Sequence, residues 1–178
     1  MKTISGLLLL VAFSMPVMGF AQNQGATPRR ALKVTSSAFP EGGKIPKKYT
    51  CDDTNVSPPL RIEGAPSNTK SVALIVEDPD APGQTWIHWL VWNIDPHTTE
   101  IREKSVPPNA VQGASDFGSA TYGGPCPPSG THRYYFKAYA LDTMLSLSPG
   151  TKKGALEKAM AGHIVAEGSL MGNYSRGR

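Results

Sequence analysis

The chain has 178 residues and a formal net charge of +4. That length suits one domain with a single hydrophobic core, and 18 glycines with 16 prolines are too many for a helical bundle. The basic residues are scattered and do not alternate with aromatic residues, so the sequence predicts no nucleic-acid partner. A mild attraction for anions remains.

The first element along the chain has the pattern of a leader. Lys2 precedes an apolar run from Leu7 to about Val17, and small residues follow, ending at Ala21. This layout is typical of a secretory signal peptide that is cleaved after Ala21. A transmembrane anchor is the alternative, but the run is shorter than the roughly 20 residues that span a bilayer. We therefore expect a signal peptide at residues 1–21 and no stable membrane anchor. The protein would be secreted across the inner membrane and be periplasmic or extracellular.

The rest of the chain reads mostly as strands. Residues 22–31 are polar and are predicted to form a flexible arm, and the domain would occupy residues 32–178. Alternation predicts one strand at Leu32–Ser36. Apolar runs rich in β-branched and aromatic residues predict three more strands, at Val72–Glu77, Ile87–Ile94 and Tyr134–Leu141. Proline-rich connections separate these runs, which favours an all-β, sandwich-like core with one or two peripheral helices.

One helix is predicted near the C-terminus. Thr151 can cap it, and the helix would run from Lys152 to about Ala166. Leu156, Met160 and Ile164 have the spacing of a single apolar helix face.

The chain has two cysteines, Cys51 and Cys126. In an oxidising compartment they can form one disulfide, which would close a long loop and stabilise the fold by about 3–4 kcal/mol. Two buried thiols near the core are the alternative, and spacing alone does not decide between them.

Three polar segments lie at the ends of the predicted strands. Asp78-Pro79-Asp80 directly follows a buried run, and Pro79 holds Asp78 extended, so both carboxylates would lie near the rim of the sheet. A structural role for these acids in a turn is the alternative.

The second segment, Trp86 to Trp89, opens the next predicted strand. Alternation places Trp86 and His88 on one face, and Ile87 and Trp89 on the other. A single histidine in a strand is more often structural, but the short separation from Asp80 can bring His88 beside the carboxylates.

The third segment, residues 122–134, is a loop rich in glycine and proline. Its backbone N–H groups can face inward and bind an anion. His132 and Tyr134 follow on one side of the next strand, while Arg133 points away and could pair with an acid.

Together these segments resemble the phosphatidylethanolamine-binding protein family, and the Raf-kinase-inhibitor-like bacterial branch in particular. The resemblance rests on DPDAP (78–82), a histidine in a Trp-rich strand, and GGPCPPSGTHRYYF (123–136). Further matches are Tyr49-Thr50-Cys51-Asp52, Ser57-Pro58-Pro59-Leu60 and Gly64-Ala65-Pro66. The likeness extends from about Phe39 to Tyr174.

The resemblance implies two antiparallel sheets and a small surface pocket for phosphate-like, phosphorylated or carboxylate groups. The ligand-binding residues that it implies are Asp78, Asp80, His88, Gly124, Pro125, His132 and Tyr134. It also brings Tyr174 towards the mouth of the pocket. Cys126 interrupts the proline loop, and only Gly83–Thr85 separate DPDAP from Trp86, so the shape of the mouth is left open.

The residues favour a secreted module that binds a small anionic ligand or a phosphorylated headgroup. We expect Asp78 to orient and charge His88, so that affinity rises as the pH falls through the histidine range. No cofactor, metal ion or catalytic residue is assigned.

Two other functions stay open. The acids and histidines could serve a metal- or acid/base-dependent hydrolase, although the sequence has no HExxH spacing, nucleophile elbow or P-loop. The same pocket could instead inhibit a protein partner such as a kinase or protease; that partner is unknown. A homodimer is compatible with the resemblance, but no sequence feature requires one.

Overall fold

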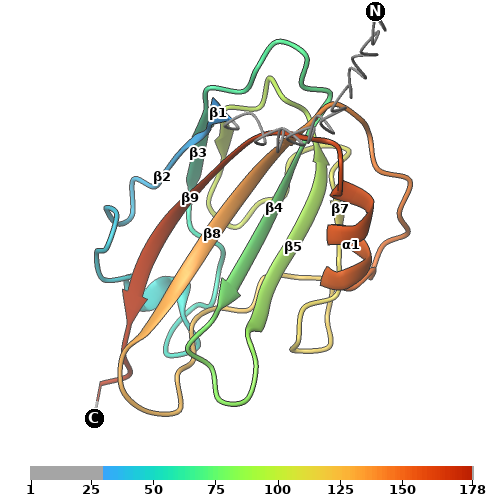
Figure 1. Ribbon diagram of the computed structural model, residues 1–178. Helices are drawn as coiled ribbons and strands as arrows, with labels where there is room; N and C mark the ends of the chain where they lie inside the picture. The colour runs from blue at the N-terminus through green and yellow to red at the C-terminus, as the bar shows by residue number, and fades with distance from the viewer. Residues whose placement is uncertain (1–29, 178) are drawn as a thin grey trace, which may run out of the picture.

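The described residues, 30–177, form two β-sheets and a short α-helix in the computed structural model (Figure 1). The elements in chain order are β1 (Arg30–Ala31), β2 (Lys33–Thr35), the 3-10 helix η1 (Lys47–Tyr49), β3 (Leu60–Glu63), β4 (Ser71–Asp78), β5 (Trp86–Ile94), β6 (Glu100–Ile101), β7 (Val111–Gln112), β8 (His132–Leu141), α1 (Lys153–Met160) and β9 (Ile164–Tyr174). The predicted all-β class and the two-sheet arrangement are confirmed. Within the described residues, no helix has the length and apolar character needed to cross a membrane.

The larger sheet has the strand order β1-β9-β8-β4-β5-β7, and the smaller sheet has the order β2-β3-β6. Neighbouring strands are antiparallel, except that β1 runs parallel to β9. Because β4 is antiparallel to both β5 and β8, the C-terminal end of β4 meets the N-terminal ends of both neighbours. These three strand ends carry the polar segments that the sequence singled out.

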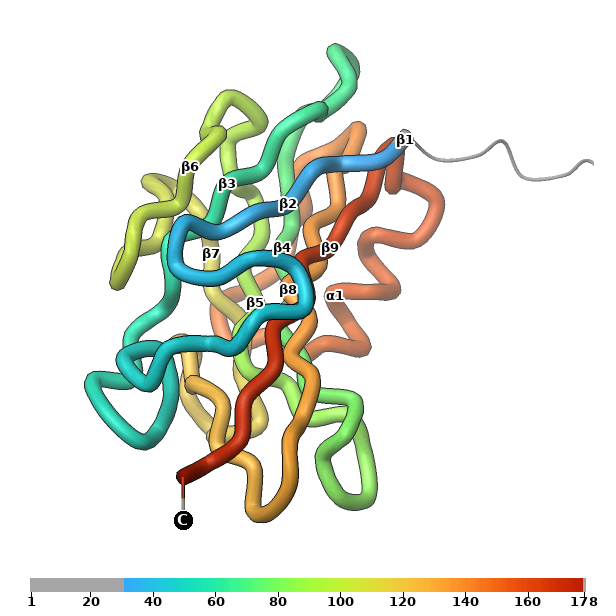
Figure 2. The backbone as a smooth tube through the Cα atoms, turned by 90° about the vertical axis from the view of Figure 1, so that its left-hand side faces the viewer, coloured from blue at the N-terminus to red at the C-terminus, as the bar shows by residue number. Residues whose placement is uncertain are grey.

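The centre of the larger sheet, at β4 and β5, is buried on both faces. Val72, Leu74 and Val76 of β4 pack into one apolar cluster together with residues of the smaller sheet. Ala73 and Ile75 pack into a second cluster with Leu156 and Met160 of α1. This explains why β4 reads as a continuous apolar run, and Figure 2 shows β3 and β6 on one side of the larger sheet and α1 on the other.

A β-bulge changes the faces predicted for β5. Val76 pairs with Trp89 and Glu77 pairs with Ile87, so His88 is an extra residue in the ladder. As a result Ile87 packs in the α1 cluster and Trp89 in the other, and the prediction that they share a face is wrong.

The N-terminal prediction needs one correction. The signal peptide predicted at residues 1–21 lies outside the described residues, as does most of the arm. The last two arm residues, Arg30 and Ala31, form β1 against β9. The Leu32 amide also bonds to Glu167 in the larger sheet before the chain crosses to β2 in the smaller one.

The predicted C-terminal helix is too long. It begins at Lys153, with Lys152 in the N-cap position, and ends at Met160. Thr151 does not cap it, because its hydroxyl donates to the Ser148 carbonyl. Gly162, with φ +83°, turns the chain, and the residues from Ile164 onward form β9.

Candidate functional site

Asp78, His88 and His132 meet at one end of the larger sheet. They come from the end of β4, the bulge near the start of β5 and the start of β8. In Figure 1 this is the lower end of the sheet, where the C-terminus also lies. All three side chains line one pocket with a volume of about 290 Å³. The full lining is Asp78, Ala81, Pro82, Trp86, His88, Phe117, Cys126, Pro128 and His132.

Asp78 pairs with His132. The imidazole Nδ1 lies 2.7 Å from Asp78 Oδ2, and the other carboxylate oxygen, Oδ1, accepts the Asp80 amide at 2.8 Å. Asp78 and His132 are only 3% and 8% exposed. The expected pairing of Asp78 with His88 is therefore wrong: β8 is the neighbour that delivers a ring to this carboxylate.

His88 is held by the backbone. Its Nδ1 lies 2.6 Å from the Gly123 carbonyl oxygen, and its ring contacts Phe117 and Tyr134 edge-on, with centroid separations of 5.3 and 5.2 Å. Burial lowers the pKa of His88, although the Gly123 carbonyl and Asp78 favour the charged form. Burial thus disfavours a charge on His88, contrary to the expectation that Asp78 charges it.

Tyr134 lies between the two histidines and is 0% exposed. Its ring contacts His88 and stacks on His132 at 6.4 Å between centroids. Burial and the nearby Asp78 carboxylate raise the pKa of its phenol, and the Cys126 backbone is also near. The hydroxyl is close to both groups but makes no hydrogen bond of good geometry. Tyr134 is not among the residues that line the pocket.

Asp80 does not line the pocket, and its carboxylate is bonded to Arg133. Its carboxylate accepts from the Arg133 amide at 2.9 Å and from two guanidinium nitrogens at 2.9 and 2.6 Å. These bonds lower the pKa of Asp80 to about 2. The expectation that Arg133 points away to pair with an acid is confirmed, and the pair fastens the β4–β5 turn to β8.

Gly124 and Pro125 are also outside the pocket lining. The Gly124 amide donates to Asn55 Oδ1 at 2.7 Å, and a Cβ on Gly124 would overlap the Tyr49 carbonyl oxygen. The Pro125 carbonyl accepts the Cys51 amide. Both residues therefore attach the loop to the segment 49–55, and the Gly124 amide is not free to bind an anion.

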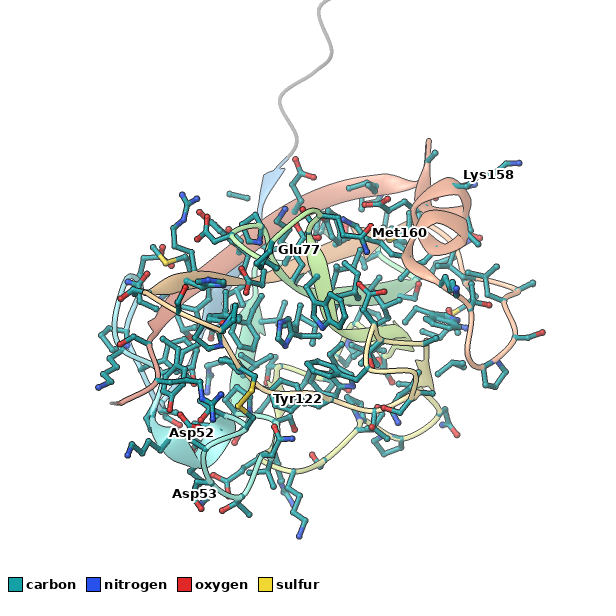
Figure 3. The ribbon with its side chains drawn as sticks, turned by 90° about the horizontal axis from the view of Figure 1, so that it is seen from below. Asp52, Asp53, Glu77, Tyr122, Lys158 and Met160 are labelled. Carbon is teal, nitrogen blue, oxygen red and sulfur yellow. A yellow bond between two sulfur atoms is a disulfide. The ribbon has the colours of Figure 1, made fainter. Side chains whose placement is uncertain are left out.

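The disulfide joins the same two segments. Cys51 and Cys126 are bonded, with Cα atoms 5.4 Å apart, so of the two alternatives the disulfide is the one found. Figure 3 shows the yellow bond between the segment that carries Asp52 and the loop that carries Tyr122. Cys126 itself lines the pocket.

The sequence pattern did not predict the apolar side chains that line the pocket. Phe117 comes from the loop between β7 and β8, is 47% exposed, and contacts Trp86 edge-on at 5.7 Å. An aromatic residue within Ser115-Asp116-Phe117-Gly118-Ser119, an otherwise polar stretch, was the available signal.

Tyr174 is the cross-strand neighbour of His132 but does not line the pocket. Its hydroxyl donates to Asp52 Oδ2 at 2.6 Å. Among the described residues, no group of three or more His, Cys, Asp or Glu is placed to hold a metal ion.

Comparison with known proteins identifies the family of the chain. A family model described as phosphatidylethanolamine-binding protein matches residues 35–175. A UPF0098 protein of Methanothermobacter thermautotrophicus is 48% identical over 151 residues, covering 82% of this chain and 100% of that protein. A UPF0098 protein of Pyrococcus horikoshii is 44% identical over 182 residues, covering 97% of this chain and 91% of that protein.

Solved structures give the same result. A phosphatidylethanolamine-binding protein homolog from Chlamydia trachomatis is 46% identical with a TM-score of 0.80, covering 83% of this chain and 99% of that one. YbcL of E. coli, described as a member of the mammalian PEBP family, is 33% identical with a TM-score of 0.77, covering 82% and 99%. The chain therefore belongs to the phosphatidylethanolamine-binding protein family.

Proposed function

We propose that the protein binds a small anionic group, phosphate-bearing or carboxylate, in the pocket lined by Asp78, His88 and His132. The observation that carries the proposal is the convergence of two buried imidazoles, His88 and His132, on one pocket of about 290 Å³, with the Tyr134 ring packed against both of them. The Tyr134 hydroxyl is buried behind these rings without a hydrogen bond of good geometry, which costs about 1–3 kcal/mol, and we expect a ligand oxygen that reaches it to remove that cost. Relatives described as phosphatidylethanolamine-binding proteins support a ligand of this chemistry.

Asp78 is compatible with an anion-binding site because its carboxylate already has hydrogen-bond donors within the protein. Both of its oxygens accept hydrogen bonds inside the protein, from His132 and from the Asp80 amide. The carboxylate thus orients the rim of the pocket without needing to touch the ligand. At longer range the net positive charge of the chain attracts anions.

The proposal is binding without catalysis. Cys126 in the pocket lining is disulfide-bonded and cannot act as a thiolate. Ser129 lines a different hollow, with Gly130 and Arg176, and not the pocket that contains His132. A panel of phosphoesterase and esterase substrates should show no turnover. Turnover by the wild type that is lost in a pocket variant would contradict the proposal that the protein binds without catalysis.

We also propose that the protein acts after export. The leader-like pattern of residues 1–21 and the Cys51–Cys126 disulfide both favour an oxidising compartment. Protein recovered from the periplasm or the medium should begin near Gln22.

The test uses Tyr134→Phe with inorganic phosphate and acetate as probes. Calorimetric titration should show saturable binding to the wild type and about tenfold weaker binding to Y134F, since one hydrogen bond to a charged ligand is lost. Because the hydroxyl makes no hydrogen bond of good geometry, Y134F should unfold at an unchanged or higher urea concentration.

Tyr174→Phe is the matched control. It loses the bond to Asp52 and should be destabilised by about 1 kcal/mol, while its phosphate affinity stays that of the wild type. No phosphate binding to the wild type, or equal binding to Y134F, would overturn the proposed function.

A further inference from the structure

A second pocket lies beside the loop that carries Cys126. It has a volume of about 390 Å³ and is lined by Tyr122, whereas Cys126 lines the pocket that contains Asp78. Figure 3 labels Tyr122 on this loop. The two pockets have no lining residue in common. The second one, which Trp89 also lines and which we call the Trp89 pocket, is therefore a separate cavity.

Part of the lining of the Trp89 pocket is apolar. The rings of Trp89 and Tyr122 meet edge-on, with centroids 5.7 Å apart, and Val56 and Val106 also line the cavity. Trp89 and Val56 are packed in the hydrophobic core, whereas Val106 is exposed. An apolar lining with a few placed polar groups is typical of pockets that bind small molecules.

Two side-chain amides in the lining have a fixed orientation. Gln112 Oε1 accepts from the Trp89 indole N–H at 2.7 Å, and Asn55 Oδ1 accepts from the Gly124 amide at 2.7 Å. Both partners are donors only, so the oxygen of each amide faces its partner and the NH2 group remains as a donor. Within residues 30–177, neither NH2 group has a hydrogen-bond acceptor.

Lys104 adds a positive charge to the same lining. The carboxylate next to it in the chain, that of Glu103, is bonded to Lys48 and to the Tyr49 hydroxyl instead. The Lys104 amide donates to the Ser57 carbonyl, which fixes the turn. No aspartate or glutamate is among the lining residues in the described part of the chain. The hydroxyl groups of the lining can donate or accept, so the pocket has an excess of donors and a net positive charge.

We propose that the Trp89 pocket binds a small aromatic carboxylate. The carboxylate oxygens only accept hydrogen bonds, so they would take the NH2 groups of Gln112 and Asn55 and the Lys104 ammonium. The aromatic ring would pack against the apolar side of the lining, where Trp89 and Tyr122 already form an edge-on pair. This site is separate from the function proposed for the Asp78 pocket and does not depend on it.

A titration with benzoate, followed by NMR, tests the proposal. The chain has three tryptophans, and their assigned indole N–H signals separate the sites, because Trp89 lines one pocket, Trp86 lines the other and Trp92 is buried in the core. Benzoate should shift the Trp89 signal saturably, with or without saturating phosphate. Benzyl alcohol has the same ring without the charge and should bind at least about tenfold more weakly.

Gln112→Glu is the sharpest variant. Its carboxylate can still accept from the Trp89 indole, but it loses the NH2 donor and adds a negative charge to the pocket. Benzoate affinity should fall at least about tenfold. Phosphate affinity at the Asp78 pocket and the urea midpoint should stay those of the wild type.

If Q112E does not fold, Lys104→Gln decides the point. It should weaken benzoate binding about threefold, as expected for one exposed charge. Lys158→Gln is the matched control, because it removes an equal charge from an exposed position on α1, and its benzoate affinity should be unchanged.

Three results would overturn the inference. Benzoate could shift the Trp86 signal and leave Trp89 unmoved, benzyl alcohol could bind as tightly as benzoate, or the Gln112 and Lys104 variants could bind benzoate as the wild type does. None of these results bears on phosphate binding at the Asp78 pocket. Conversely, a protein that binds benzoate at Trp89 but no phosphate would support the inference and contradict the proposed function.

Discussion

Glu77 and Asp78 are neighbours in the chain but face opposite sides of the larger sheet. Asp78 lies in the pocket, whereas the Glu77 carboxylate, on a residue 5% exposed, accepts from Lys137 at 2.5 Å and Lys153 at 2.7 Å. Lys153 opens α1, so Glu77 fastens the helix to the sheet. Figure 3 labels Glu77 beside the larger sheet and Met160 on the helix.

Glu77→Gln should therefore change the acid stability of the protein. Burial opposes the charge of Glu77, but the bonds from Lys137 and Lys153 outweigh it and lower the pKa below 4.5. A lowered folded-state pKa stabilises the fold above pH 4.5, and that stability is lost as the pH falls through the lowered value. E77Q should lose about 2 kcal/mol at pH 7 and show a flatter stability profile below pH 4.5.

Urea unfolding from pH 2 to pH 7 measures this change. The matched control is Glu63→Gln, which removes an exposed ion pair with Arg61 and should cost at most about 1 kcal/mol. If the stability of E77Q and E63Q to urea depended on pH in the same way, the ion pairs of Glu77 would not be the acid-sensitive contact between α1 and the larger sheet.

Of the seven residues expected to bind the ligand, three line the pocket (Asp78, His88 and His132) and four do not (Asp80, Gly124, Pro125 and Tyr134). Strand ends alone brought Asp78, His88 and His132 together. The partner of Asp78 depended on the bulge at His88, which shifts that ring onto the Gly123 carbonyl. A bulge adds one residue without any change in composition, so alternation could not reveal it.

At the scale of elements, dense apolar runs were easy to recognise and β9 was not. β4, β5 and β8 appeared close to their observed bounds. β9 contains Gly168 and Gly172, which read as breaks in a strand. Tertiary packing explains the glycine in β9, because a Cβ on Gly168 would overlap the Leu32 carbonyl oxygen. Close approach of the N-terminal segment requires glycine there, and no local pattern encodes it.

Gly168→Ala should therefore be strongly destabilising. The added Cβ would force β9 and the Leu32 backbone apart, which we expect to cost at least about 2 kcal/mol in urea unfolding. Gly154→Ala is the control, because it lies in α1 with open space around it and should stabilise the protein by about 0.5–1 kcal/mol. A neutral G168A would show that the N-terminal segment does not need this contact.

At the scale of the whole molecule, the pocket wall depends on the attachment of the loop 122–128 to the segment 49–55. The disulfide is one attachment. Three hydrogen bonds are others: Tyr122 hydroxyl to Tyr49 carbonyl at 2.9 Å, Gly124 amide to Asn55 at 2.7 Å, and Cys51 amide to Pro125 carbonyl at 3.1 Å. Each bond lies within a few residues of the cystine.

This arrangement predicts that loss of the disulfide affects stability more than binding. The double variant C51A/C126A should lose about 3–4 kcal/mol in urea unfolding, because the unfolded chain is no longer constrained. Its phosphate affinity should change less than about threefold, since the three hydrogen bonds still position this part of the loop at the pocket. Dithiothreitol treatment of the wild type is the control that alters no residue and should give the same two results. If phosphate affinity were lost while circular dichroism showed a native fold, the disulfide alone would position the pocket wall. The three hydrogen bonds would then form only because the disulfide holds the two segments together.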